Sequence, residues 1–105
     1  MAQVVIVYWR DIPAQVIAEQ GRGRNRQSAK VELPARFAAA IDSAAMRGDA
    51  SDTEAYLAAW RRGAADECGA DLAAEAARVA AMLDTAYDRD KLRALVLAGG
   101  RAGNA

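Results

Sequence analysis

Apolar residues cluster in three short stretches in the first third of the chain. The run from Val4 to Trp9 is apolar, aromatic and rich in β-branched residues, which is typical of a buried strand. Residues 10–13 interrupt this strand. Pro13 cannot donate a hydrogen bond to a neighbouring strand, so we expect a turn there. Residues 15–20 predict a second strand, and the alternation of apolar and polar positions over 29–33 predicts a third. The short connections favour antiparallel pairing.

Helical spacing begins after the third predicted strand. Pro34 suits a first helical turn, and Phe37, Ile41 and Ala44 share one face of a helix over residues 35–47 that Gly48 ends. The segment from Ser51 to Glu54 has the capping-box pattern. It predicts a second helix that turns three large side chains toward the core and ends near residues 61–63. These side chains are Tyr56, Leu57 and Trp60.

Two further helices are predicted toward the end of the chain. Asp71 is placed as the N-cap of the first. Asp88 is placed as the N-cap of the second, with Tyr87 packing on Leu92 as a hydrophobic staple, and Gly99-Gly100 ends that helix. The apolar stripe of the first comprises Leu72, Ala76, Val79, Leu83 and Ala86.

The order of these elements predicts the fold class. Strands followed by helices indicate an α+β fold, here a small antiparallel sheet of about three strands followed by three or four helices packed on one face. A length of 105 residues fits a single domain over 1–105, with a frayed tail at 101–105.

Charge changes this picture at one place, the loop that joins the second and third predicted strands. The net charge is zero, but residues 1–30 hold five basic and two acidic side chains. In the loop Gly21–Arg26, three arginines alternate with small, turn-prone residues. They are the best candidates for an anion-binding site, because arginine donates in a fork that fits carboxylates and phosphates. The predicted ligand-binding set is Arg10, Arg22, Arg24, Arg26 and Lys30, with Trp9 as a stacking surface. The alternative is a solvated loop without a partner.

Missing residue types exclude several chemistries. The chain has no histidine and one cysteine, Cys68, so Ser–His and Cys–His catalysis and the usual structural zinc sites are excluded within it. The carboxylate pairs at 66/67 and 88/90 have the pattern of surface groups. We therefore predict no catalytic residues, no metal and no cofactor. The glycines of the loop lack the spacing and the following helix of a dinucleotide fingerprint.

Location and partner class follow from the same composition. A lone cysteine fits a reducing compartment, and the apolar run of the first strand is too short for a signal peptide or a membrane span. A cytoplasmic protein without a membrane partner is expected. The neutral net charge disfavours broad nucleic-acid binding. The oligomeric state stays open.

Four stretches of the chain resemble one known family. They are residues 7–16 (VYWRDIPAQV), the Gly21–Arg24 loop, residues 36–42 (RFAAAID) and residues 56–62 (YLAAWRR). Together they resemble the small bacterial virulence factor family, also found as a domain in the conserved virulence factor C type of protein. The resemblance covers roughly residues 3–98, and it implies an accessory protein without agreed catalytic residues. Because some members are encoded near one-carbon and folate-dependent enzymes, it also implies such an enzyme, or an acidic polyglutamylated folate, as the partner of the arginine loop.

The sequence thus predicts a non-catalytic binding or adaptor domain. Its partner would be a protein or an anionic small molecule held by the arginine loop. Two alternatives remain: an accessory subunit that supplies an arginine to a partner's active site in trans, and a nucleic-acid-binding domain whose affinity falls steeply with salt.

Overall fold

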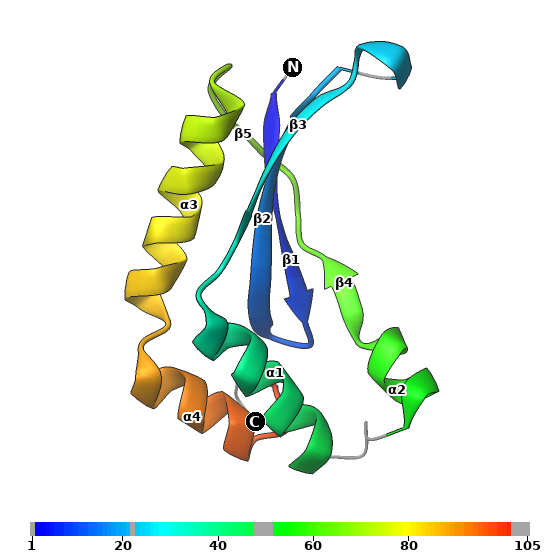
Figure 1. The fold of residues 1–105 in the computed structure, drawn as a ribbon, viewed down its shortest axis with the longest axis vertical. Helices are drawn as coiled ribbons and strands as arrows, with labels where there is room; N and C mark the ends of the chain where they lie inside the picture. Colours follow the sequence, from blue (N-terminus) through cyan, green and yellow to red (C-terminus); the bar gives the residue numbers. More distant parts are fainter. Residues whose placement is uncertain (1, 22, 48–51, 102–105) are drawn as a thin grey trace.

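A long β-hairpin forms the centre of the molecule. The computed structural model describes residues 2–21, 23–47 and 52–101. Strands β1 (Gln3–Trp9) and β2 (Ile12–Gln20) pair antiparallel and are joined by a two-residue turn (Figure 1). Their register shifts between Val7 and Tyr8.

The predicted turn over residues 10–13 is wrong in its second half. β2 already begins at Ile12, and Pro13 lies within it, opposite Tyr8 at the register shift. An irregularity of this kind tolerates a residue without an N–H donor. Pro13 is also fully buried, so packing at the end of the hairpin outweighs the turn preference of proline.

Three shorter strands complete the sheet. β3 (Gln27–Glu32) pairs with β2 after a short 3₁₀ turn, η1 (Gly23–Asn25). On the other side of β1, β4 (Trp60–Arg62) pairs with one half of that strand and β5 (Asp66–Glu67) with the other. The strand order is therefore β3-β2-β1, with β4 and β5 sharing the remaining edge of β1. Neither β4 nor β5 is predicted by the sequence pattern, and the predicted helical position of Trp60 is wrong, because Trp60 begins β4.

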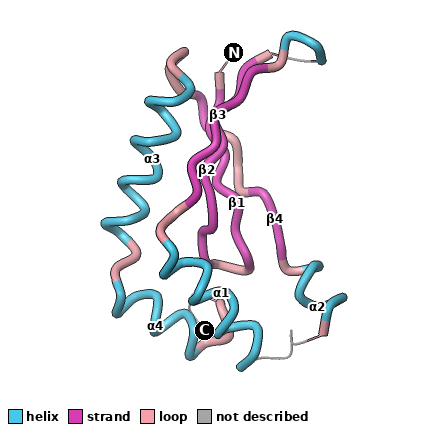
Figure 2. Tube along the Cα trace, viewed as in Figure 1, coloured by secondary structure: helices cyan, strands magenta, loops and turns pink. Residues whose placement is uncertain are grey.

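Within the described residues, four helices pack along one face of the sheet and around its hairpin-turn end (Figure 2). α3 (Leu72–Ala86) lies along β2 and β3 and covers one face. α1 (Ala35–Arg47) and α4 (Arg89–Leu97) pack together near the hairpin turn, and α2 (Thr53–Ala58) lies beside β4. This confirms the α+β class, with a sheet larger than the predicted one by two short strands.

Three helices begin at an aspartate. Asp71 and Asp88 cap α3 and α4 as predicted, and each carboxylate accepts the backbone N–H three residues later. In α2 the same role belongs to Asp52. The two remaining predicted boundary signals, Ser51 and Gly48, lie outside the described residues.

The main core lies between α3, α1, α4 and one face of the sheet. Sheet residues Val4, Val16 and Ala18 belong to the same buried cluster as Ala76, Val79 and Leu83 of α3 and Phe37, Ile41 and Ala44 of α1, as the helical spacing predicted. Two expected core residues are instead exposed. Leu57 is 60% exposed, because α2 turns it away from the sheet, and Ala86 is exposed at the end of α3.

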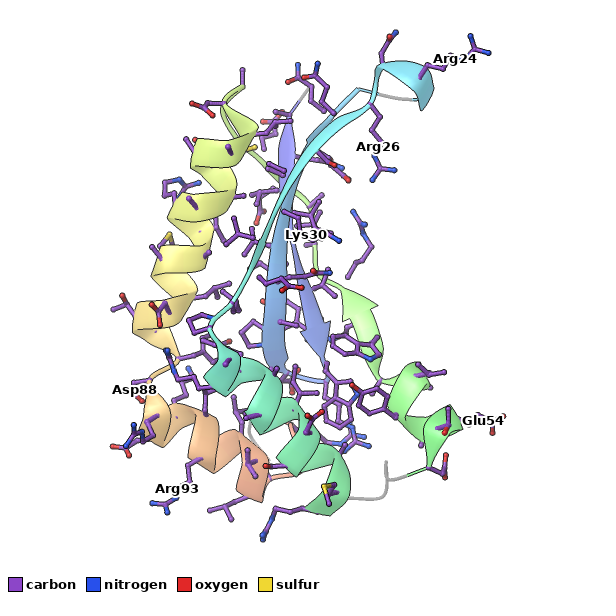
Figure 3. All side chains as sticks on the ribbon, in the orientation of Figure 1. Arg24, Arg26, Lys30, Glu54, Asp88 and Arg93 are labelled. Atoms are coloured by element: carbon purple, nitrogen blue, oxygen red, sulfur yellow. The ribbon has the colours of Figure 1, made fainter. Side chains whose placement is uncertain are left out.

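The opposite side of the sheet is called the outer face here. It carries the residues that alternate with the core positions of β1 and β2, among them Gln3, Val5, Ile17 and Glu19. Figure 3 shows Arg26 and Lys30 pointing to this side, away from α3.

Candidate functional site

A buried carboxylate organises the outer face at the end where η1 lies. Glu19 is 8% exposed and sits opposite Gln3 in the β1–β2 ladder. Its Oε1 accepts from Nη2 of Arg26 at 2.6 Å, and its Oε2 accepts from Nε2 of Gln3 and from Nη2 of Arg62, both at 3.0 Å. One carboxylate thus holds side chains from β1, β4 and the segment before β3.

These contacts keep Glu19 ionised. The hydrogen bond from Gln3 and then the one from Arg26 lower the pKa of the Glu19 carboxyl, and the positive charges of Arg26 and Arg62 act in the same direction. Burial opposes them by raising the pKa, but the net shift is downward. The site therefore keeps one fixed negative charge between two guanidinium groups near neutral pH.

The two arginines border a shallow hollow of about 510 Å³ on the surface. Their side chains remain 54% exposed for Arg26 and 50% exposed for Arg62. A guanidinium has five N–H donors, so each retains donors beyond the one given to Glu19. The hollow can offer these donors to a carboxylate or phosphate. Gln3, Gln20, Gly21 and Gly23 complete its lining.

Of the other predicted basic residues, Arg24 and Lys30 do not line this hollow. Arg24 is exposed on η1 and extends beyond the end of the sheet, and Lys30 is exposed on β3, opposite Ile17 of β2 (Figure 3). Arg22 lies outside the described residues. Arg62 is not in the predicted set, because nothing in a linear pattern places a residue 36 positions after Arg26 beside it.

Arg10 and Trp9 belong to the other end of the hairpin. Trp9 is fully buried, and its Nε1 donates to the Tyr56 carbonyl at 3.0 Å, so its ring is not available as a stacking surface for a ligand. The guanidinium carbon of Arg10 lies 4.9 Å from the centre of that ring, and Arg10 Nη1 donates to the Gly99 carbonyl at 2.7 Å. The predicted cluster is thus split between the two ends of β1.

The remaining candidates for chemistry are the thiol of Cys68 and any group of metal-binding side chains. Cys68 is half-buried, and burial, followed by the charge of Glu75, raises the pKa of its thiol, which disfavours the nucleophilic thiolate. Within residues 2–21, 23–47 and 52–101, no group of three or more histidine, cysteine or acidic side chains is arranged to hold a metal ion. Over the same ranges, no helix has the length and apolar character needed to cross a membrane.

Comparison with known protein families identifies the family of the chain. The family model described as "Virulence factor" matches residues 7–96, from the second half of β1 to α4. No curated protein and no solved structure matches the chain. The family match confirms the resemblance carried by the four sequence stretches.

Proposed function

Because the chain belongs to the virulence factor family, we propose that it is a non-catalytic binding domain, an adaptor that recognises an anionic ligand or the acidic surface of a partner protein. The recognition site is the hollow of the outer face, with Arg26 and Arg62 as its main donors and Arg24 and Lys30 as neighbouring charges.

The observation that carries this proposal is the orientation of two arginines by one carboxylate. Glu19 holds Arg26 and Arg62 by one nitrogen each, so part of their side-chain freedom is already lost before a ligand arrives. The lining of the hollow carries two guanidinium groups and one carboxylate, which leaves a net positive charge. A ligand that shelters these donors from water gains about 1.5–3 kcal/mol per charged hydrogen bond, and less where the contact stays exposed.

The probes follow from the chemistry of this hollow. Inorganic phosphate and a short oligoglutamate peptide represent the phosphate and polycarboxylate classes, and the peptide also represents the tail of a polyglutamylated folate. Calorimetric titration at low salt compares the wild type with the double variant R26Q/R62Q. Glutamine can still donate to Glu19 but carries no charge. We expect binding of at least one probe, weakened about tenfold in the double variant.

A second double variant separates a specific site from general charge. R89Q/R93Q removes the same number of charges from exposed positions on α4, far along the chain from the hollow. We expect its affinity for the probes to equal that of the wild type. Equal weakening in both double variants, or no binding by the wild type, contradicts the proposal.

One observation favours a second candidate function, an arginine supplied in trans. Arg24 extends from η1 beyond the end of the sheet, and within the described part of the chain it has no ion-pair partner (Figure 3). In this function, Arg24→Ala would leave the complex with a folate-dependent enzyme intact and lower the turnover of that enzyme. An unchanged turnover contradicts this candidate and leaves the binding proposal standing.

A further inference from the structure

A second concavity lies on the molecule where the end of β3 meets α1, α2 and β4. It has a volume of about 320 Å³, at the lower end of the range of small-ligand pockets. Leu33 and Ile41 contribute apolar wall, Tyr56 and Trp60 contribute rings, and Glu32 and Asp42 contribute carboxylates. Every residue that lines this groove is described, and none is a lysine or arginine. Its charge is therefore opposite to that of the hollow around Glu19.

The aromatic side chains that line the groove have no cationic neighbour in the described structure, unlike the other aromatic side chains of the chain. The chain has six aromatic side chains, all in the described ranges, and four of them have a cationic group 4.4–4.9 Å from the ring centre. The two rings without such a cation in the described structure are Tyr56 and Trp60, which both line the groove. They meet edge to face, with centroids 6.0 Å apart and planes at 84°. The ring of Trp9 also packs near Tyr56, with the two ring centroids 5.8 Å apart.

The carboxylates of the groove also have no cationic neighbour. Glu19, Asp11, Glu75 and Asp84 each form an ion pair with an arginine, whereas the groove carboxylates, like exposed Glu54 and Asp90 elsewhere in the described chain, do not. Glu32 and Asp42 are exposed, and neither has an ion-pair partner within the described residues. Two rings and two carboxylates without cations thus share one groove, although they come from four different elements.

We propose that this groove binds an organic cation, a guanidinium or ammonium group carried on a short alkyl stem. The cationic head lies between the two carboxylates and against the rings, where a cation gains both ionic and cation–π attraction. The stem lies along Leu33 and Ile41 and removes apolar surface from water. The head belongs either to a free amine or guanidine, or to a lysine or arginine side chain of a partner protein. This inference does not depend on the anion site of the outer face.

The tryptophans supply a local readout for the test. The indole N–H of Trp60 reports on the groove, whereas that of Trp9 is buried and hydrogen-bonded to Tyr56 and serves as an internal reference. Two-dimensional NMR of the full chain follows both signals during titration with butylguanidinium, with its neutral analogue butylurea, and with the blocked tripeptide Gly-Arg-Gly. Trp60→Phe assigns the two signals.

We expect saturable movement of the Trp60 signal with a cationic probe, and affinity about tenfold weaker for butylurea. Binding of butylguanidinium identifies a free cation as sufficient. Binding of the tripeptide alone identifies a side chain on a protein backbone as the source. The double variant E32Q/D42N should weaken the binding probe about tenfold.

Two further variants test whether the probes bind in the groove. Glu54→Gln removes an exposed carboxylate from α2 outside the groove and should leave the affinity unchanged (Figure 3). Trp60→Leu, followed through the other backbone amides, should weaken binding while the pattern of the folded spectrum is kept. The proposal is overturned if neither cationic probe gives a saturable shift, if butylurea binds equally well, or if Glu54→Gln acts like E32Q/D42N.

Discussion

At the scale of single residues, a tightly constrained contact joins the hairpin turn to the segment that follows α4. Arg10 has a positive φ of 54°, a conformation that side chains other than glycine rarely adopt. Its stacking on Trp9 and its hydrogen bond to Gly99 offset that cost, and the Asp11 N–H donates to the Gly100 carbonyl at 2.8 Å. Gly100 passes so close to Trp9 that no side chain fits between them.

Gly100→Ala tests this close approach. A Cβ at Gly100 would lie 2.9 Å from a ring carbon of Trp9, and the φ of +89° is itself unfavourable for alanine. We expect the free energy of unfolding in urea to fall by about 2–4 kcal/mol. Gly23→Ala is the matched control, since its φ is also positive, +57°, but a Cβ there meets no atom within 4 Å. It should cost about 1 kcal/mol, and equal losses in the two variants would refute steric contact with Trp9 as the cause.

The ionised Glu19 makes stability depend on pH with a definite sign. Its pKa is lower in the folded protein than its ordinary value of 4.5, so its stabilising contribution is complete above that value and is lost as the pH falls through the folded-state pKa. We expect Glu19→Gln to lower the free energy of unfolding by about 1–2 kcal/mol at pH 7. Urea titrations from pH 7 to pH 3 should show this difference shrinking below pH 4.5. A difference that is constant over the whole range would contradict the ionised role of Glu19.

At the scale of elements, the edge formed by β4 and β5 shows where sequence reasoning ends. The caps of α3 and α4 and the buried face of α1 were predictable, because each depends on residues within one or two turns. β4 has only three residues, follows α2 at once and shows no alternation. Its strand conformation comes from pairing with β1, which lies about 50 positions earlier in the chain. A strand that forms through pairing with a distant strand leaves no recognisable pattern in its own sequence.

A bulge separates the two edge strands. Arg62 faces Val7 and Asp66 faces Val4, so residues 63–65 of the edge lie against the two residues between Val4 and Val7. The Gly63 N–H donates to the Ile6 carbonyl at 2.8 Å, at the start of the bulge. We expect this position to set the direction of Arg62 and hence its reach to Glu19.

Gly63→Ala should disturb the edge and the Arg62 contact together. The new Cβ would lie 2.9 Å from the Tyr8 ring and 3.1 Å from the Ile6 carbonyl oxygen. We expect the free energy of unfolding to fall by about 1–3 kcal/mol and the pKa of Glu19, followed by NMR, to rise toward its ordinary value. In Gly69→Ala the nearest atom is the flexible end of Glu75, at 3.2 Å. That variant should stay within about 0.5 kcal/mol of the wild type. An unchanged Glu19 pKa in a destabilised Gly63→Ala would show that the bulge does not orient Arg62.

At the scale of the whole molecule, the candidate sites combine residues that are far apart in the chain. Arg24, Arg26 and Lys30 were predictable as a basic loop, because they are close in sequence. Glu19, whose carboxylate orients Arg26, could not be predicted as part of the site, and neither could Arg62. Their positions beside Arg26 depend on strand register. The groove with Glu32, Asp42 and Trp60 was missed for the same reason, since its residues come from separate elements that pack together only in the folded chain. A basic hollow and an acidic groove thus lie at different ends of β3.

The contact between the hairpin turn and residues 99–100 also has a consequence for the order of folding. The hydrogen bond from Arg10 to Gly99 spans 89 positions, so closing it costs the entropy of ordering a long loop, and such contacts form late. Until they form, Trp9, the largest buried side chain, lacks the segment that packs on it. We therefore expect the turn end of the β1–β2 hairpin to be among the last parts of the described chain to become protected from water.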